Sequence, residues 1–269
     1  MVGRNAHGGS ALLRALAALP VAEQRRLRVE QVRRAGQEAL SKGVTTFHDA
    51  GASFATIDLY RELAQAGELP VRLYAMVGGE SVERLAKELP RYRLVGHANH
   101  FLTVRAIKRM VDGALGSRSA WLLEPYTDAP DSTGLVVDSL ETIARTAELA
   151  AANGYQLNTH AIDVPRFARR GVIASMQGVH ATSDGPWVPK RLGEPRAGER
   201  TYVWRSLIDS GALVSNGTDV PVEDIDPLAS FRASVTREMV NGQRFHPEQN
   251  MTRQEALAAF GNGTVYLEK

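Results

Sequence analysis

Short apolar and β-branched runs alternate along the chain with amphipathic segments. Six runs have the length of strands, at residues 44–51, 71–77, 103–111, 156–161, 172–177 and 212–222. Between them apolar residues recur every three or four positions, which is typical of helices with one buried face, as at residues 22–42, 55–66, 81–89, 200–209 and 227–240. This alternation predicts right-handed βαβ units and a parallel sheet, either doubly wound or closed into a barrel.

Helix starts are also marked in the sequence. Asp138 with Glu141, and Thr252 with Glu255, have the spacing of a capping box. Two short helices are predicted at residues 10–19 and 165–170, and a polar loop is predicted around the DGPW segment at residues 184–187.

A polar residue stands at or just beyond the carboxyl end of strand after strand. These residues are His48, Asp49, Asp112, His160, Gln177, His180 and Asp219. In a parallel barrel the carboxyl ends of the strands meet on one face, and that face carries the active site. No GxGxxG or GxxxxGK[ST] motif follows any of the strands, which disfavours a nucleotide-binding sheet.

Taken singly, each candidate has two interpretations. Lys108 inside a strand is either an edge lysine with its ammonium in water or a lysine that points into a barrel mouth. His160 is a hydrogen-bonded histidine or a metal ligand. Asp219, in NGTDVP, is a turn or helix-cap residue or a site carboxylate. Trp187 is a pocket aromatic or a packing residue.

Composition narrows the function classes. The 269 residues carry a net charge of only +2, with lysine and arginine spread along the chain, so nothing indicates a nucleic-acid surface. The absence of cysteine excludes disulfides and thiolate-bound zinc, and leaves His, Asp, Glu and modified Lys as metal ligands. No apolar run approaches the length of a membrane span, and Arg14 interrupts the N-terminal apolar segment, which disfavours a signal peptide.

In combination the residues resemble a known family. Ordered strings such as GVTTFHDAG, KRMVDGALGSRSAWLLEPYTD, SDGPWVPKRLG and SNGTDVPVEDIDPL are similar to those of the amidohydrolase superfamily, in its YtcJ-like branch, the amidohydrolase type 3 group. The resemblance extends from about residue 35 to residue 260. It implies one metal-dependent hydrolase domain, a (β/α)8 barrel of the TIM type, of which about six of the eight strands are present.

The resemblance also implies roles for individual residues. Lys108, in carboxylated form, His160 and Asp219 correspond to metal ligands, with zinc as the expected divalent ion. Asp219 is in addition the catalytic base and acid. The substrate would be bound by Asp112, Gly113 and other groups of the loop that follows the Lys108 strand, and by the 184–191 segment over the mouth, with Arg118 and Trp187 as further contacts.

The chain departs from the family pattern in three places. It contains no His-x-His motif, which the family carries on its first strand, and the resemblance predicts that the chain begins beyond that strand. A helix and a strand with a further histidine are predicted to be missing just after His160. The C-terminal part of the family pattern is expected to be missing as well. His48 and His180 are the candidates to replace the missing ligands.

Two functions follow from these expectations. The first is a hydrolase of carbon–nitrogen bonds in a small molecule, acting through a metal-activated water. The second is a catalytically inactive barrel remnant that serves as a binding or assembly module. In both cases we expect a cytoplasmic chain without nucleic-acid or membrane partners, and open sheet edges favour a homo-oligomer.

Overall fold

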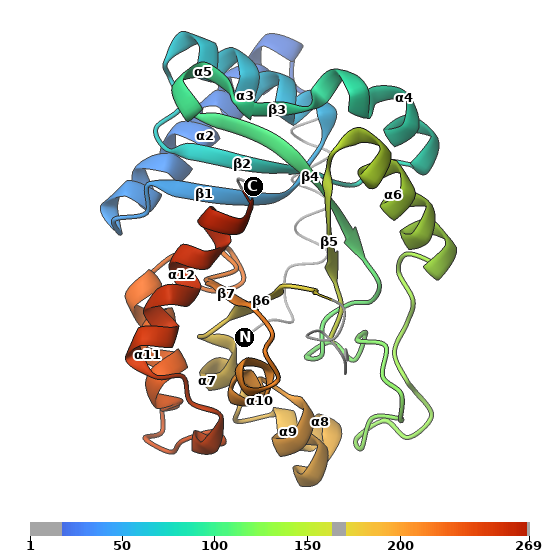
Figure 1. Ribbon diagram of the computed structural model, residues 1–269, viewed down its shortest axis with the longest axis vertical. Helices are drawn as coiled ribbons and strands as arrows, with labels where there is room; N and C mark the ends of the chain where they lie inside the picture. The colour runs from blue at the N-terminus through green and yellow to red at the C-terminus, as the bar shows by residue number, and fades with distance from the viewer. Residues whose placement is uncertain (1–17, 163–170, 268–269) are drawn as a thin grey trace. The chain divides into compact units, whose positions relative to one another are not determined.

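Seven strands form two sheets in the computed structural model, which describes residues 18–162 and 171–267 (Figure 1). The first sheet has the order β1-β2-β4-β3, with β5 paired to β4, and the second contains β6 and β7. All six predicted strands are present. The helices predicted at residues 10–19 and 165–170 lie almost entirely outside the described residues.

The chain divides into two units, residues 1–77 with 91–105 and residues 78–90 with 106–269. In unit 1, β1 (Thr46–Ala52) pairs in parallel with β2 (Arg72–Val77), and β3 (Leu94–Gly96) pairs antiparallel with β4 (Leu102–Met110). Its helices are α2 (Val21–Ser41), α3 (Phe54–Ala66) and the short α5 (His97–His100). The three-residue strand β3 is absent from the sequence prediction because it is too short to show an alternating pattern.

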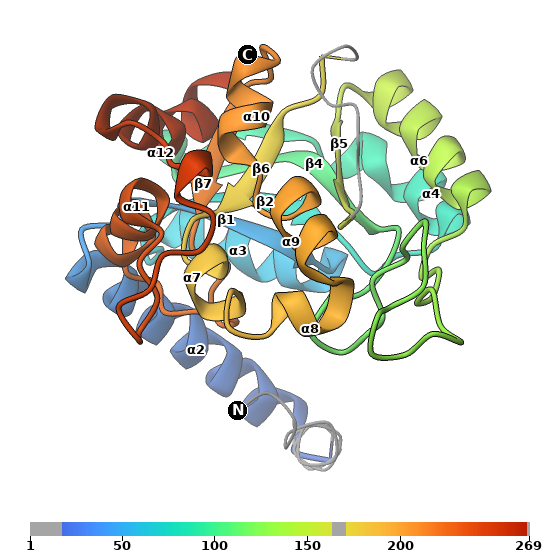
Figure 2. The ribbon, with the colours of Figure 1, turned by 90° about the horizontal axis from the view of Figure 1, so that it is seen from below.

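Unit 2 contains the end of β4, which pairs in parallel with β5 (Gln156–His160), and the parallel pair β6 (Ala174–Gln177) and β7 (Val214–Gly217). Helix α4 (Val82–Tyr92) begins in this unit, and α6 (Leu140–Asn153) follows a long loop. The remaining helices are α7 (His180–Asp184), α8 (Val188–Leu192), α9 (Glu194–Arg200), α10 (Trp204–Asp209), α11 (Pro227–Thr236), the 3-10 turn η2 (Pro247–Gln249) and α12 (Arg253–Leu267). Figure 2 shows α8 and α9 side by side.

One expectation about helix capping needs correction. Ser139, and not Asp138, caps α6, because its hydroxyl accepts from the amide of Thr142 at 3.1 Å while Asp138 accepts from the amide of Met110. The predicted loop around DGPW is present as the turn between α7 and α8, two short helices that the sequence did not predict. The strands of the described residues form two separate sheets, so closure into a barrel stays a prediction. The mixed α/β class with parallel pairing is confirmed.

The core of unit 2 surrounds the indole ring of Trp204, which is fully buried. Arg237 lies with its guanidinium 4.8 Å from the centre of that ring and 5.5 Å from the ring of Phe245. Burial lowers the pKa of Arg237 to about 10. None of the described helices is long and apolar enough to span a membrane.

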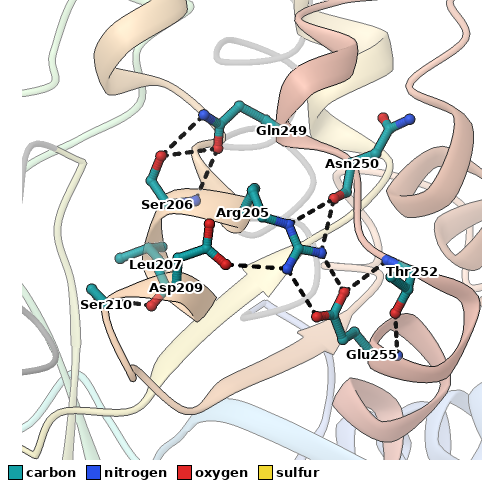
Figure 3. Close-up of polar contacts among 9 residues, drawn as sticks. All are labelled: Arg205, Ser206, Leu207, Asp209, Ser210, Gln249, Asn250, Thr252 and Glu255. Carbon is teal, nitrogen blue, oxygen red and sulfur yellow. Dashed lines mark hydrogen bonds and ion pairs between the residues drawn. The ribbon is translucent and has the colours of Figure 1, made fainter.

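One arginine joins α10, η2 and α12 (Figure 3). Arg205 donates to both carboxylate oxygens of Glu255, to Asp209 at 3.3 Å and to the backbone oxygen of Asn250 at 3.2 Å. Glu255 also accepts from the amide of Thr252, whose hydroxyl accepts from the amide of Glu255, so the predicted capping box is confirmed. The bonds from Arg205 lower the pKa of Glu255 to about 2.

We predict that Arg205→Ala lowers the free energy of unfolding by about 1–3 kcal/mol, because it removes several charge-assisted hydrogen bonds at once. Arg232→Ala is the control, since Arg232 forms a single exposed ion pair with Glu238 at 3.3 Å and its loss should cost less than about 1 kcal/mol. Urea denaturation followed by circular dichroism measures both values. Equal losses in the two variants would contradict the role of Arg205.

We also predict a pH dependence of this contribution. The pKa of Glu255 is lowered in the folded chain, so the stabilisation is fully present above its unfolded value of about 4.3 and is lost as the pH falls toward about 2. The difference in unfolding free energy between the wild type and Glu255→Gln should therefore shrink between about pH 5 and pH 2. A difference that stays constant over this range would show that the ion pair does not contribute.

Candidate active site

The carboxyl ends of β6 and β7 are joined to α11 by a chain of hydrogen bonds. The side chain of Asn216 accepts from the amide of Gly178 at 2.9 Å and donates to the hydroxyl of Ser234 at 2.9 Å. Ser230 donates to the backbone oxygen of Gly217 at 2.9 Å. A Cβ atom at Gly178 would overlap Ser234 Oγ and the backbone oxygen of Ser230, so the helix approaches the strand as closely as glycine allows.

This junction positions two side chains that follow the strands. His180 lies three residues after β6, and Asp219 lies two residues after β7. His180 Nε2 is 3.6 Å from Asp219 Oδ2, and this nitrogen is buried without a hydrogen-bond partner. Asp219 has a φ of 58°, a left-handed conformation that aspartate tolerates, and its backbone oxygen accepts from the amide of Val222 at 2.8 Å. Asp219 is therefore a turn residue whose carboxylate also faces a histidine.

Lys108 is the third member of this group. Its side chain is half-buried in β4, and desolvation lowers the pKa of its amine, an effect that the nearby charge of Asp219 opposes. The amine is thus within electrostatic reach of the Asp219 carboxylate. That Lys108 and Asp219 act together at a site stays a prediction. We refer to Lys108, His180 and Asp219 as the Asp219 cluster.

A second pair of residues borders His180. Asp184, at the other end of α7, accepts a hydrogen bond from the hydroxyl of Tyr202. Burial raises the pKa of the Asp184 carboxyl, and the hydrogen bond from Tyr202 and the charge of His180 act in the opposite direction. Burial, with the charge of Asp184, raises the pKa of Tyr202 well above its ordinary value. Asp184 is therefore close enough to His180 for the two groups to interact electrostatically.

His160, the other predicted ligand, is found in a different set of contacts. Its Nε2 lies 3.2 Å from the backbone oxygen of Gly113 and 3.6 Å from Asp112 Oδ1. Asp112 is almost fully buried, accepts from the amide of Trp121 at 2.9 Å, and has a raised pKa because of its desolvation. The register of β4 and β5, in which Met110 faces His160, places His160 on the same sheet face as Lys108.

The predicted substrate contacts form part of the loop that follows β4. Arg118 donates to both carboxylate oxygens of Asp128 at 3.0 Å, and Arg191 forms an ion pair with the same carboxylate. The guanidinium of Arg191 lies 5.8 Å from the ring of Trp187, and a Cβ atom at Gly116 would lie 3.4 Å from that ring. Arg118 and Trp187 therefore both belong to a network that connects the loop to α8.

His48, a candidate replacement ligand, lies in β1 of unit 1. Its ring centre is 5.2 Å from that of Tyr74, and burial lowers the pKa of its imidazole. The neighbouring Asp49 accepts from the hydroxyl of Tyr60 at 2.7 Å. Both polar residues at the end of this strand thus have contacts within their own unit.

The Asp219 cluster fits a divalent metal ion in its chemistry. Within the described residues no three side chains of His, Asp or Glu lie close enough together to hold an ion, so such a set would need a donor of another type. A carboxylated Lys108 supplies an oxygen donor, and Asp219 and His180 supply an oxygen and a nitrogen. The buried and unpartnered Nε2 of His180 beside a carboxylate is the observation that favours a bound cation.

The sequence prediction included Lys108 and Asp219, and it did not include Asp184 and Tyr202, which border His180 or its neighbour in the structure. Asp184 stands four residues after His180, a spacing that places two side chains on the same side of a helix, so this pair could have been found if α7 had been predicted. The contact with Tyr202 has no local signal in the sequence, because it joins residues that are 18 positions apart.

A model described as the amidohydrolase family matches residues 2–165 and 163–268. The two segments overlap at residues 163–165. This is the place, just after His160, where the family resemblance predicts that a helix and a strand are missing.

Two curated relatives were also found. The chain is 27% identical to the putative amidohydrolase YtcJ of Bacillus subtilis over 278 residues, 87% of this chain and 51% of that protein. It is 30% identical to Protein LONG AFTER FAR-RED 3 of Arabidopsis thaliana over 258 residues, 78% of this chain and 44% of that protein. The chain thus spans about half the length of these relatives.

Two solved structures have the same fold. An uncharacterized metal-dependent hydrolase from Pyrococcus horikoshii superposes with a TM-score of 0.80 at 24% identity, over 91% of this chain and 56% of that one. An uncharacterized metal-dependent hydrolase from Pyrococcus furiosus gives a TM-score of 0.79 at 26% identity, over 93% of this chain and 57% of that one. Each of these two longer chains therefore contains the fold of this chain in somewhat more than half of its length.

We predict that Gly178→Ala lowers the free energy of unfolding by about 1–3 kcal/mol, since the added methyl group must push α11 away from β6. Gly217→Ala is the matched control at the end of the neighbouring strand, because a Cβ atom there meets nothing within 4 Å. Thermal and urea unfolding of both variants measure the effect. A Gly178→Ala variant as stable as Gly217→Ala would contradict the close packing.

Proposed function

This chain belongs to the amidohydrolase family, and from that membership we propose that it is a metal-dependent hydrolase. The proposed reaction is hydrolysis of a carbon–nitrogen bond, of the amide type, in a small molecule. The observation that carries the proposal is the Asp219 cluster, in which a carboxylate faces a half-buried lysine and a buried histidine nitrogen.

Lys108 and Asp219 are the proposed ligands in the Asp219 cluster, with His160 as the third ligand that the family resemblance implies. Desolvation favours the neutral amine of Lys108, which is the form that adds to carbon dioxide; the product is a carbamate, and one proton is released. Zinc suits such a set of oxygen and nitrogen donors. The ion would supply a water with a strongly lowered pKa, and so a hydroxide near neutral pH.

Asp219 is the proposed proton carrier of the reaction. Its carboxylate is half exposed, so water and substrate reach it. As the water oxygen bonds to the substrate carbonyl carbon, the carboxylate takes a proton from that water. It then returns the proton to the nitrogen as the carbon–nitrogen bond breaks, so Asp219 ends the cycle in its starting form.

Substrate contacts are proposed at the loop that follows β4. Asp112 and Gly113 form the base of this loop, where the backbone oxygen of Gly113 lies next to the ring of His160. Arg118 keeps part of its guanidinium in solvent while bound to Asp128, and Trp187 offers an apolar surface that is partly buried. This combination of one cation and one aromatic ring suits a small molecule with both polar and apolar parts.

The remaining parts of the proposal concern the whole protein. We propose that the full arrangement of strands is a (β/α)8 barrel in one domain, that the protein works in the cytoplasm, and that it forms homo-oligomers. The support for the barrel is the parallel pairing of β1 with β2, β4 with β5, and β6 with β7. The support for oligomers applies to the chain as given, in which the two-stranded sheet of β6 and β7 has edges that can pair with strands of another chain.

One observation favours the second candidate function, an inactive module for binding or assembly. Within residues 18–162 and 171–267, no three His, Asp or Glu side chains form a metal-binding group. In that case the fold would persist without zinc, and amide substrates would not be hydrolysed. Metal content separates the two candidates, because the hydrolase needs an ion and the inactive module does not.

We predict that the purified chain binds about one zinc ion and hydrolyses members of an amide library. Asp219→Asn should lower kcat by about 100-fold or more, because the amide cannot carry the proton. Asp224→Asn is the control, an exposed aspartate of the same segment. Elemental analysis and product detection by mass spectrometry provide the measurements. A folded chain without zinc and without activity would support the inactive module.

A further inference from the structure

His180 is a partly buried polar residue of the Asp219 cluster to which the proposed function assigns no ligand role. Its side chain is 17% exposed, and its Nε2 has no hydrogen-bond partner although Asp219 is its neighbour. A buried nitrogen without a partner is costly, so its position needs a physical reason. The sequence analysis gave this residue only one role, that of a candidate to replace a missing metal ligand.

The separation of 3.6 Å between His180 Nε2 and Asp219 Oδ2 is informative. A direct N–H···O hydrogen bond would be about 2.7–3.2 Å long, so the two atoms are too far apart for one. Two atoms bound to the same tetrahedral zinc ion, each at about 2.0–2.2 Å, lie about 3.3–3.6 Å apart. The observed distance therefore matches two ligands of one ion better than a hydrogen-bonded pair.

The surroundings of His180 also suit a ligand. Metal-binding histidines commonly have a carboxylate near the ring, which raises the basicity of the imidazole and orients it. Asp184 lies within electrostatic reach of His180 and is itself fixed by the hydroxyl of Tyr202. The junction with α11 limits the movement of the segment on which His180 is carried.

We propose that His180 Nε2 and the carboxylate of Asp219 bind the same divalent cation. This inference rests on the proposed function and deepens it, because it assigns a nitrogen ligand to a chain that contains no His-x-His motif. Lys108, whose amine the charge of Asp219 influences, would supply a third donor if it is carboxylated. The site takes a cation that prefers nitrogen and oxygen ligands, such as zinc or cobalt.

The first test measures zinc affinity by calorimetry in the full chain and four variants. His180→Ala and Asp219→Ala should each raise the Kd by about 100-fold or more, since even partners outside the ligand shell cost 10–100-fold. His160→Ala tests the ligand that the family resemblance implies. His246→Ala should leave the Kd unchanged, because His246 is paired with Glu248 at 3.2 Å and serves as the histidine control.

The second test looks for a new absorption band in a variant, whereas the first test measures a loss of zinc affinity. Because the wild-type chain has no cysteine, His180→Cys introduces its only thiol. With Co²⁺ as the probe, we expect a sulfur-to-cobalt charge-transfer band in His180→Cys that is absent from the wild type. Addition of excess zinc should remove the band, and circular dichroism should show that both proteins are folded.

The outcomes separate this inference from the proposed function. If zinc binds the wild type and His180→Ala equally, and His180→Cys gives no charge-transfer band, then His180 is not a ligand while the hydrolase proposal stands. If the folded wild type binds neither zinc nor cobalt, both proposals fail. If affinity falls in His180→Ala and the band appears, His180 is a ligand of the ion.

Discussion

The close contact between Gly178 and α11 is the constraint on which the site depends. A helix can approach the end of β6 this closely only because residue 178 has no side chain. Asn216, on the neighbouring strand, then reaches both the amide of Gly178 and the hydroxyl of Ser234. Polar groups that would otherwise be buried without partners are satisfied by one another, which gives the junction a single arrangement.

The junction determines which side chains of the Asp219 cluster lie close together. Each strand of the parallel pair ends at the same edge, so the segments that leave β6 and β7 deliver His180 and Asp219 to the same place. Lys108 approaches the Asp219 carboxylate from β4, and its own desolvation favours a neutral amine. The Asp219 carboxylate is thus 3.6 Å from a buried imidazole nitrogen and acts electrostatically on the amine of Lys108. The unpartnered nitrogen is the reason for proposing a cation at this place.

Much of the fold could be predicted because its signals are local. The six strands and most helices show their own periodicity, and the capping box of Thr252 and Glu255 has a fixed spacing. Strand β3 and the short helices α7 and α8 could not be predicted, since a few residues carry no periodic pattern. At the start of α6, Ser139 and Asp138 are both good caps, and the hydrogen bond that Asp138 accepts from the amide of Met110 decides between them.

Local signals in the sequence also account for the part of the site that could be predicted. Asp219 could be placed at a site because the ends of parallel strands converge, whereas the pairing of Lys108 with Asp219 came from the family resemblance. His160 was assigned to that pair, whereas its described contacts are with Gly113 and Asp112, groups that were expected to bind substrate. The position of a ring within the site depends on the path of the loop after β4, and that path is set by long-range contacts such as the bond from the amide of Trp121 to Asp112.

The central claim is that Asp219 and His180 share one cation, and anomalous X-ray diffraction from crystals grown with zinc tests it most directly. The account predicts a single strong peak about 2.0–2.2 Å from both the Asp219 carboxylate and His180 Nε2. A peak bound elsewhere, or no peak in well-ordered crystals, would contradict it.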